Sequence, residues 1–271
     1  MALDRVDVMK RRDLLAGMAA SAISASATSA DASVNAPNTF LEIRSYKLHN
    51  SFESQASHLS GFLESAYQPA VARAGASLIG AFNIYIGPES PCVIAITQYA
   101  SLAVLQESMA KLAADAEYQA QLTALDGQGG FPYVRFESSL LRSFDGMPHA
   151  LLTDPNEKKP SRIFELRIYE SHTLATLARK VNMFNSGEIG IFQKLGMRPV
   201  FFGETLVGPR QPNLMYMLSF DDLAAREKLW HEFGSDPDWK KLSTQPGLSD
   251  AQIVSNISNV ILRPLSFSLI R

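Results

Sequence analysis

The stretch Glu42–His49, with the sequence EIRSYKLH, returns 123 residues later as Glu165–His172, with the sequence ELRIYESH. The offset then falls to 121 residues and stays there to the C-terminus, so that Gly87-Pro88 matches Gly208-Pro209. Chance does not keep one register over such a distance, and self-similarity at a fixed period marks a repeated structural unit. The sequence therefore predicts one fold present twice.

Each copy carries the same order of element signals. Apolar and polar residues alternate along its first strand, and apolar residues recur at helical spacing in the segment that follows. Two strand-like runs joined by the Gly-Pro loop, a second helix and a closing strand complete the copy. In the second copy we expect these elements near residues 174–184, 200–207, 214–220, 223–233 and 253–262. Pro69 and Gly190 occupy equivalent positions late in the first helix, where we expect both helices to bend.

This βαββαβ order is that of the ferredoxin-like split βαβ unit, an antiparallel sheet with both helices on one face. One such sheet leaves its other face bare. We therefore predict an α+β fold in which two tandem ferredoxin-like domains pack sheet to sheet and close a barrel within one chain. The expected boundaries are residues 40–144 for the first domain, 145–161 for a polar, Pro-containing linker, and 162–271 for the second domain.

The N-terminus predicts an export signal. Lys10-Arg11-Arg12 precedes Leu14–Ala30, an uncharged stretch dominated by Ala and Ser. Paired arginines before a weakly apolar segment resemble a twin-arginine signal, which predicts a periplasmic or extracellular protein. The alternative is a disordered Ala/Ser tail. We expect residues 1–30 to form the signal peptide and residues 31–39 a disordered leader. No later stretch is apolar enough to predict a membrane span after signal removal.

Composition narrows the functional classes. The 271 residues include 25 Lys+Arg and 27 Asp+Glu, a net charge of -2, which gives no positive field to attract nucleic acid. The single cysteine, Cys92, excludes an internal disulfide, and its apolar surroundings predict an inert core residue. No spacing of His, Asp and Glu suits a metal, and no nucleophile elbow marks a hydrolase. We expect no metal and no cofactor, with haem left open, and a monomer or a homodimer.

Several of these motifs together resemble the NIPSNAP family. They are the strand E-[IL]-R-x-Y, the Gly-Pro hairpin, and the segment Phe220–Arg226 leading to Asp236-Pro237-Asp238-Trp239. The second copy carries the resemblance well, whereas the first has Tyr118 in place of the tryptophan and Ala116 in place of the proline. The resemblance implies tandem NIPSNAP-like domains that form an intramolecular dimeric α/β barrel. It implies no defined activity, although related barrel families include cofactor-free oxygenases and haem-handling proteins.

The polar face of the first strand in each copy supplies the candidate site. Side chains alternate along a strand, so Glu, Arg and Tyr share one face in each copy. We expect this face to point into the space between the two sheets, where the residues of both copies would meet: Glu42, Arg44, Tyr46, Glu165, Arg167 and Tyr169. One interpretation is a buried ladder of ion pairs that fixes how the copies dock. The other is a pocket in which Arg167 holds an anionic ligand and Tyr169 donates a proton or a hydrogen bond.

Three further residues belong to the same hypothesis. His49 and His172 lie at equivalent positions just after the tyrosines, where they could bind a ligand or, in the case of His172, transfer a proton. The alternative is that both are surface or capping histidines. Arg263 in the last strand could complete a charged pocket or pair with a glutamate of the first strands.

Two functions follow from these observations. The first is an exported small-molecule-binding or interaction protein of undefined activity. The second is a small-molecule enzyme, oxygenase-like or isomerase-like and free of cofactor, that acts on an anionic or aromatic substrate with Tyr169 and His172 as catalytic residues.

Overall fold

The computed structural model describes residues 37–50, 55–126, 131–154 and 162–271. All of them fall in one compact unit, Asn35–Arg271. The expected signal peptide and most of the expected leader lie outside the described residues. None of the described helices is long and apolar enough to cross a bilayer.

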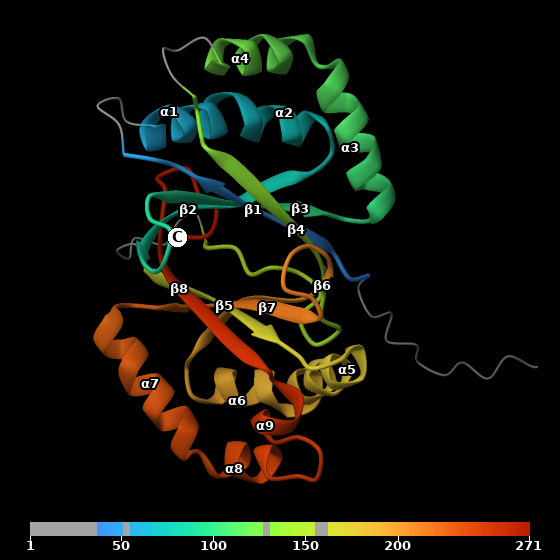
Figure 1. Ribbon diagram of the computed structural model, residues 1–271, viewed down its shortest axis with the longest axis vertical. Helices are drawn as coiled ribbons and strands as arrows, with labels where there is room; N and C mark the ends of the chain where they lie inside the picture. Colours follow the sequence, from blue (N-terminus) through green and yellow to red (C-terminus); the bar gives the residue numbers. More distant parts are fainter. Residues whose placement is uncertain (1–36, 51–54, 127–130, 155–161) are drawn as a thin grey trace, which may run out of the picture. The chain divides into compact units, whose positions relative to one another are not determined.

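The strands of both halves join in one closed barrel of antiparallel strands, in the order β1-β3-β2-β8-β5-β7-β6-β4 (Figure 1). In each half the first strand lies between the third and the fourth, which is the ferredoxin-like order. The predicted α+β fold with two tandem ferredoxin-like units is confirmed. The strands are β1 (Phe40–Lys47), β2 (Ser77–Ile86), β3 (Cys92–Tyr99), β4 (Arg135–Ser143), β5 (Ile163–Glu170), β6 (Arg198–Val207), β7 (Asn213–Phe220) and β8 (Asn256–Pro264).

The two halves are also joined along their edges, which the sequence did not predict. Strand β2 pairs with β8, with Asn83 opposite Arg263, and β4 pairs with β6, with Arg142 opposite Glu204. An unpaired edge strand exposes a row of backbone donors and acceptors, and closing the barrel removes every such edge. The faces of the two sheets therefore enclose a shared interior, and backbone hydrogen bonds seal it on both sides.

Helices cover the outside of the barrel. Helices α1–α4 lie over the first half and α5–α9 over the second (Figure 1). A π-helical turn precedes Pro69 and another precedes Gly190, so each irregularity lies close to the position where the sequence predicts a bend. The helical segments are α1 (Gln55–Phe62), η1 (Leu63–Tyr67), α2 (Gln68–Arg73), α3 (Leu102–Ala114), α4 (Ala116–Asp126), α5 (Leu174–Met183), η2 (Phe184–Glu188), α6 (Ile189–Lys194), α7 (Leu223–Ser235), α8 (Pro237–Ser243) and α9 (Asp250–Ile253).

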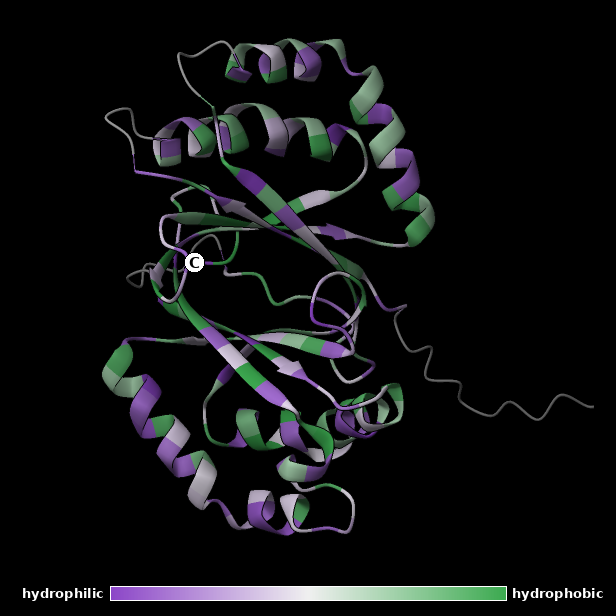
Figure 2. Ribbon diagram, viewed as in Figure 1, coloured by the Kyte–Doolittle hydropathy of each residue, from purple (hydrophilic) through white to green (hydrophobic). Residues whose placement is uncertain are grey.

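The barrel wall separates three apolar clusters. One fills the interior and contains Leu41, Ile43, Phe82 and Phe164. The other two lie between the wall and the helices, one over each half. Strand residues thus alternate between the interior and the helix layer, as Leu262 and Ile261 do. Figure 2 shows that β8 carries both polar and apolar residues along its length.

The two ends of the barrel are closed differently. At one end lie the β2–β3 and β6–β7 hairpins, each of which packs against the closing strand of the other half. A Cβ added to Gly87 would come within 2.8 Å of Val260 Cγ1, and one added to Gly208 would come within 2.8 Å of Ser139 Oγ, so both approaches need a glycine. At the far end of β2 the C-terminal segment closes the interior, where the Ile270 N–H donates to the Ile79 carbonyl at 3.1 Å.

The described part of the predicted linker lies against the barrel. The Pro148 carbonyl accepts from the Thr39 N–H at 3.0 Å, and the Leu151 N–H donates to the Val200 carbonyl at 2.8 Å. Residues 155–161 of that linker lie outside the described residues.

Candidate functional site

The glutamates, arginines and tyrosines of β1 and β5 point outward, toward the helices. The expectation that these residues meet in the space between the sheets is wrong for all six of them: Glu42, Arg44, Tyr46, Glu165, Arg167 and Tyr169. Apolar residues of the same strands, including Ile43, occupy the interior instead. The physical reason is that the outer face supplies polar partners to these charged groups. Helix α7 brings such partners to Glu165, and strands β3 and β4 bring them to Glu42. The polar residues of β1 therefore lie under the helices of the first half and those of β5 under the helices of the second, with the barrel interior between them.

Glu165 is the centre of the network in the second half. Its side chain is 0% exposed, and four residues donate five hydrogen bonds to it. Burial alone would raise the pKa of Glu165, but the bonds from Arg226 and the charge of Arg167 hold it below its usual range. The donors are Arg167 Nη1 at 2.8 Å, Arg226 Nη2 at 2.6 Å and Nε at 2.9 Å, Trp230 Nε1 at 2.8 Å, and Asn259 Nδ2 at 2.7 Å.

Glu42 occupies the equivalent position in the first half and has fewer partners. It accepts from Arg44 Nε at 2.7 Å, from Ser138 Oγ at 2.7 Å and from the Tyr99 hydroxyl at 3.1 Å. Burial would raise the pKa of Glu42, and Arg44 together with these bonds lowers it. The Arg44 guanidinium also lies 5.7 Å from the ring centroid of Tyr67 and 5.6 Å from that of Phe136. Each glutamate thus accepts hydrogen bonds from neighbouring strands of its own half and thereby links those strands.

The tyrosines are buried beside these networks. Tyr169 accepts from the Tyr216 hydroxyl at 2.8 Å and from Arg167 Nη2 at 3.3 Å. Burial raises the pKa of Tyr169, and it raises that of Tyr46 to about 12. Both phenols therefore stay protonated near neutral pH.

The remaining predicted site residues lie apart from these networks. His172 is exposed after β5, and His49 is exposed and contacts Gln55, whose amide lies 3.0 Å from its Nε2. Arg263 stacks on Tyr85, with 3.7 Å between the guanidinium carbon and the ring centroid. The structure does not bring the two histidines or Arg263 to the carboxylates of the first strands.

A buried ion pair that the sequence did not predict joins α5 to η2 in the second half. Lys180 Nζ donates to Glu188 Oε2 at 2.9 Å, and the two side chains are 1% and 2% exposed. Burial would lower the pKa of Lys180, but the carboxylates of Glu188 and Asp250 raise it, so the lysine stays charged. The ammonium also lies 4.9 Å from the Phe184 ring centroid and 5.4 Å from that of Trp239.

A cavity of about 310 Å³ lies inside the barrel at the hairpin end. Both halves contribute to it. Its apolar surface comes from interior positions of the strands, and its polar surface comes from the hairpin tips and the ends of β1, β4 and β8. The apolar part includes Ile43, Ile94, Leu166, Ile168, Met215 and Val260.

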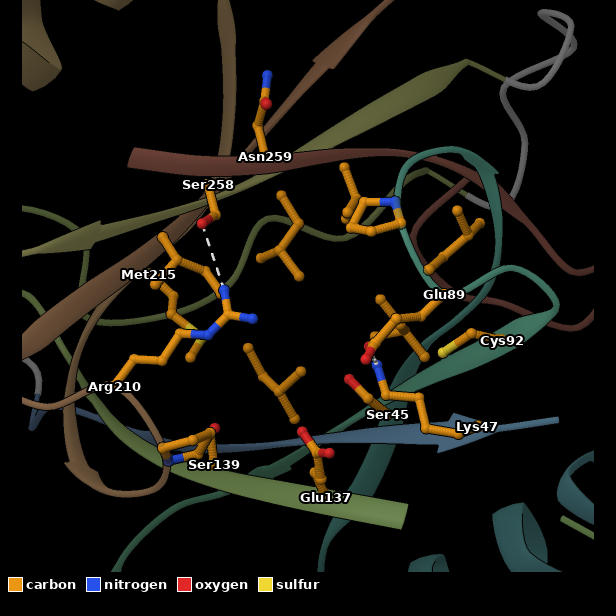
Figure 3. A pocket seen from close by; sticks show the side chains of 18 residues that line it. Ser45, Lys47, Glu89, Cys92, Glu137, Ser139, Arg210, Met215, Ser258 and Asn259 are labelled. Atoms are coloured by element: carbon orange, nitrogen blue, oxygen red, sulfur yellow. Dashed lines mark hydrogen bonds and ion pairs between the residues drawn. The ribbon is translucent and has the colours of Figure 1, made fainter. Parts of the chain in front are cut away.

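Charged side chains gather at the rim of this cavity (Figure 3). Lys47 pairs with Glu89 on one side, and Arg210 points across from the other, where its Nη1 donates to Ser258 Oγ at 3.3 Å. The side chain of Asn259 points away from the cavity, toward Glu165.

Glu89 and Arg210 are equivalent residues that carry opposite charges. Each follows the Gly-Pro pair of its hairpin, and each has a φ of 61°, a left-handed conformation that is unfavourable for residues other than glycine. The Gly-Pro pairs align the two copies, and the residues directly after them are Glu89 and Arg210. The opposite charges at one repeated position were the signal that could have revealed this site.

Cys92 also lines this cavity, at the start of β3 and opposite Lys47 of β1. It is 3% exposed, and burial raises the pKa of its thiol to about 11. Its place in a buried strand agrees with the prediction. Among the residues that the structure describes, no group of three or more His, Cys, Asp or Glu side chains is placed to hold a metal ion.

Solved structures that match most of this chain share its fold at low sequence identity. A monooxygenase-like protein from Lactobacillus acidophilus is 11% identical, with a TM-score of 0.54 over 84% of this chain and 94% of the other. An anthrone oxidase-like protein is 13% identical, with a TM-score of 0.51 over 84% and 92%. A NIPSNAP family protein from Agrobacterium tumefaciens is 21% identical and covers 45% of this chain and 100% of its own, with a TM-score of 0.38.

At these identities the structural likeness concerns the fold alone. Comparison with curated proteins finds no match. The NIPSNAP family model, in contrast, matches residues 41–127 and again residues 164–269, which together make up most of the chain. With its repeated strand motif, its Gly-Pro hairpins and its doubled ferredoxin-like unit, the chain belongs to the NIPSNAP family.

Proposed function

We propose that this chain is a small-molecule-binding protein whose ligand occupies the cavity at the hairpin end of the barrel. The observation that carries the proposal is the cavity itself, about 310 Å³ in volume, inside the barrel. Ligand sites are concave, mostly apolar and furnished with a few polar groups, and their volumes begin at roughly 300 Å³. The cavity reaches this volume, and its apolar interior part lies next to a rim that is richer in polar and charged groups than most such sites.

The carboxylates of Glu42 and Glu165 already have hydrogen-bond partners within the protein, which favours the cavity over these networks as the ligand site. The Glu165 carboxylate already accepts five hydrogen bonds, and its side chain is fully buried. A ligand could bind there only by displacing Arg167 or Arg226 and leaving a buried charge uncompensated, which is strongly unfavourable. Binding at the rim of the cavity does not require a buried ion pair of this kind to be broken.

Binding is better supported by the geometry than catalysis. The enzyme hypothesis assigns proton transfer to Tyr169 and His172, yet Tyr169 is buried against Tyr216 while His172 is exposed. A general acid or base must lie within hydrogen-bonding reach of the reacting atom. Neither residue lines the cavity, whereas binding requires only the groups that do.

We also propose that the protein is exported through the twin-arginine route. The support is Lys10-Arg11-Arg12 followed by the uncharged segment Leu14–Ala30, which lies outside the described residues. Replacing both arginines by lysine should leave the full-length precursor in the cytoplasmic fraction, whereas the unchanged chain should reach the periplasm in a shortened form. Export of the lysine variant at the normal level would contradict the proposal.

The binding proposal is tested by filling the cavity. Ligand-observed NMR with a library of fragments of about ten heavy atoms should detect binding to the unchanged protein. Ile168→Trp projects a large ring into the cavity and should abolish it, since the ring replaces empty space rather than packed atoms. Leu174→Trp is the control, because Leu174 is 75% exposed on α5. Absence of fragment binding to the unchanged protein, or equal binding to Ile168→Trp, would refute the proposal.

A further inference from the structure

The charges at the rim of the cavity point to a class of ligand. We propose that the cavity binds a small carboxylate with an apolar body, and that Arg210 holds the carboxylate group. The inference rests on the proposed function, because it names the ligand of the same cavity. Four rim residues carry charge: Lys47, Glu89, Glu137 and Arg210.

Both acidic groups at the rim already have a basic partner. Glu89 pairs with Lys47, and the Arg135 guanidinium lies 3.7 Å from Glu89 and 3.3 Å from Glu137. The hydrogen bonds and charge of Lys47 lower the pKa of Glu89, so the pair is ionised at neutral pH. Lys47 is therefore neutralised, and neither carboxylate is left to attract a cation.

Arg210 is the cation that remains. Its Nη1 donates a hydrogen bond to Ser258 Oγ at 3.3 Å, and its charge also helps to lower the pKa of Glu89 across the cavity, but no described carboxylate lies within 4.0 Å of its guanidinium. Figure 3 shows the guanidinium directed into the cavity from the side opposite Lys47 and Glu89. A guanidinium presents five N–H donors in a plane that matches the two oxygens of a carboxylate. One donor bonds to Ser258, so the others are available to a ligand.

The rest of the cavity sets the size and polarity of the ligand. A volume of 310 Å³ corresponds to about ten water molecules at roughly 30 Å³ each. The ligand therefore has on the order of ten heavy atoms. Below the rim, Ile94, Leu166 and Met215 offer apolar contacts and no charge. Benzoate and hexanoate have this size and this division into an anionic head and an apolar body.

The repeat supplies a matched set of charge variants. Glutamate is already tolerated at the left-handed tip of one hairpin and arginine at the tip of the other, so Arg210→Glu and Glu89→Arg each place a side chain that the equivalent hairpin carries. The double variant exchanges the two residues and keeps the total charge of the rim. These substitutions change the charge facing the ligand without altering the apolar floor.

The test measures dissociation constants for benzoate and hexanoate against their neutral amides, benzamide and hexanamide. The unchanged protein should bind each carboxylate about tenfold more tightly than its amide, the size of one charge-assisted hydrogen bond. Arg210→Glu should remove that preference and leave amide binding unchanged, and the double exchange should restore it. The carboxylate preference of the unchanged protein should also shrink as salt rises, whereas amide binding should not.

The outcomes separate the two proposals. Equal affinity for carboxylates and amides, or an unchanged carboxylate preference in Arg210→Glu, would overturn the anion assignment while leaving the cavity as a binding site. If the unchanged protein binds neither carboxylates nor amides at saturating concentrations, the proposed function itself fails, and the assignment of Arg210 fails with it.

Discussion

Replacing Glu165 by glutamine should destabilise the fold far more than the same change at Glu42. Glutamine keeps the shape of the side chain but removes the charge that balances Arg167 and Arg226, which are only 13% and 24% exposed. Removing one partner of a buried ion pair costs about 3–5 kcal/mol. Glu42 is 14% exposed and faces a single arginine, so Glu42→Gln should cost about 1–3 kcal/mol, in the range of a few lost hydrogen bonds.

Thermal and urea unfolding measure this difference. For a domain of this size each 1 kcal/mol lowers the Tm by roughly 2–4 °C, so Glu165→Gln should lower it by roughly 6–20 °C. The folded pKa of Glu165 lies below its unfolded value. Its stabilising effect is therefore complete above the unfolded pKa of about 4.3 and is lost as the pH falls through the folded pKa. The gap between the unchanged protein and Glu165→Gln should be full at pH 7 and narrow below about pH 4. Equal losses for the two variants, or a stable Glu165→Gln that no longer binds cavity ligands, would refute the structural role of Glu165.

Three further predictions concern residues described above. Lys180→Met leaves the buried Glu188 carboxylate without the ammonium group that balances it and should lower the free energy of unfolding in urea by about 3–5 kcal/mol. Adding Glu188→Gln to Lys180→Met should recover part of this loss, and a double variant no more stable than the single one would contradict the prediction. Native Cys92 should react with iodoacetamide at pH 7.5 far more slowly than in urea, because burial raises its thiol pKa to about 11; equal rates would show an exposed thiol. Gly208→Ala should be destabilising by about 1–3 kcal/mol, since the new Cβ meets Ser139 Oγ at 2.8 Å, whereas Gly61→Ala in α1 meets nothing within 4 Å and should stabilise the helix by about 0.5–1 kcal/mol; a harmless Gly208→Ala would mean that the hairpin can move away from β4.

The sequence predicted the fold in detail because the repeat tested every element twice. The strand, hairpin and helix signals of one copy recur in the other. The motif Asp236-Pro237 begins α8, and the Asp236 side chain accepts from the Asp238 and Trp239 N–H groups. The edge pairing of β2 with β8 and of β4 with β6 could not be predicted, because both pairs join residues of different copies and depend on the closure of the barrel.

The alternation of side chains could not by itself predict which face of β1 and of β5 points into the barrel. Period two separates Ile43 from Arg44, but it does not say which of the two faces the interior, because helices bury the outer face as well. Helix α7 held the missing information. Arg226 and Trp230 are four residues apart and thus share one side of that helix, where both donate hydrogen bonds to Glu165.

The two hairpin tips show what fusion into one polypeptide permits. In an assembly of two identical subunits, both tips would carry the same residue, and the mouth of the barrel would face either two acids or two bases. Here one gene product supplies Glu89 and Arg210 separately. Because the halves are joined in one chain, the two sides of the mouth need not be identical, and a residue on one side can be replaced without the same replacement on the other. An asymmetric molecule with one charged end can then be bound in a single orientation.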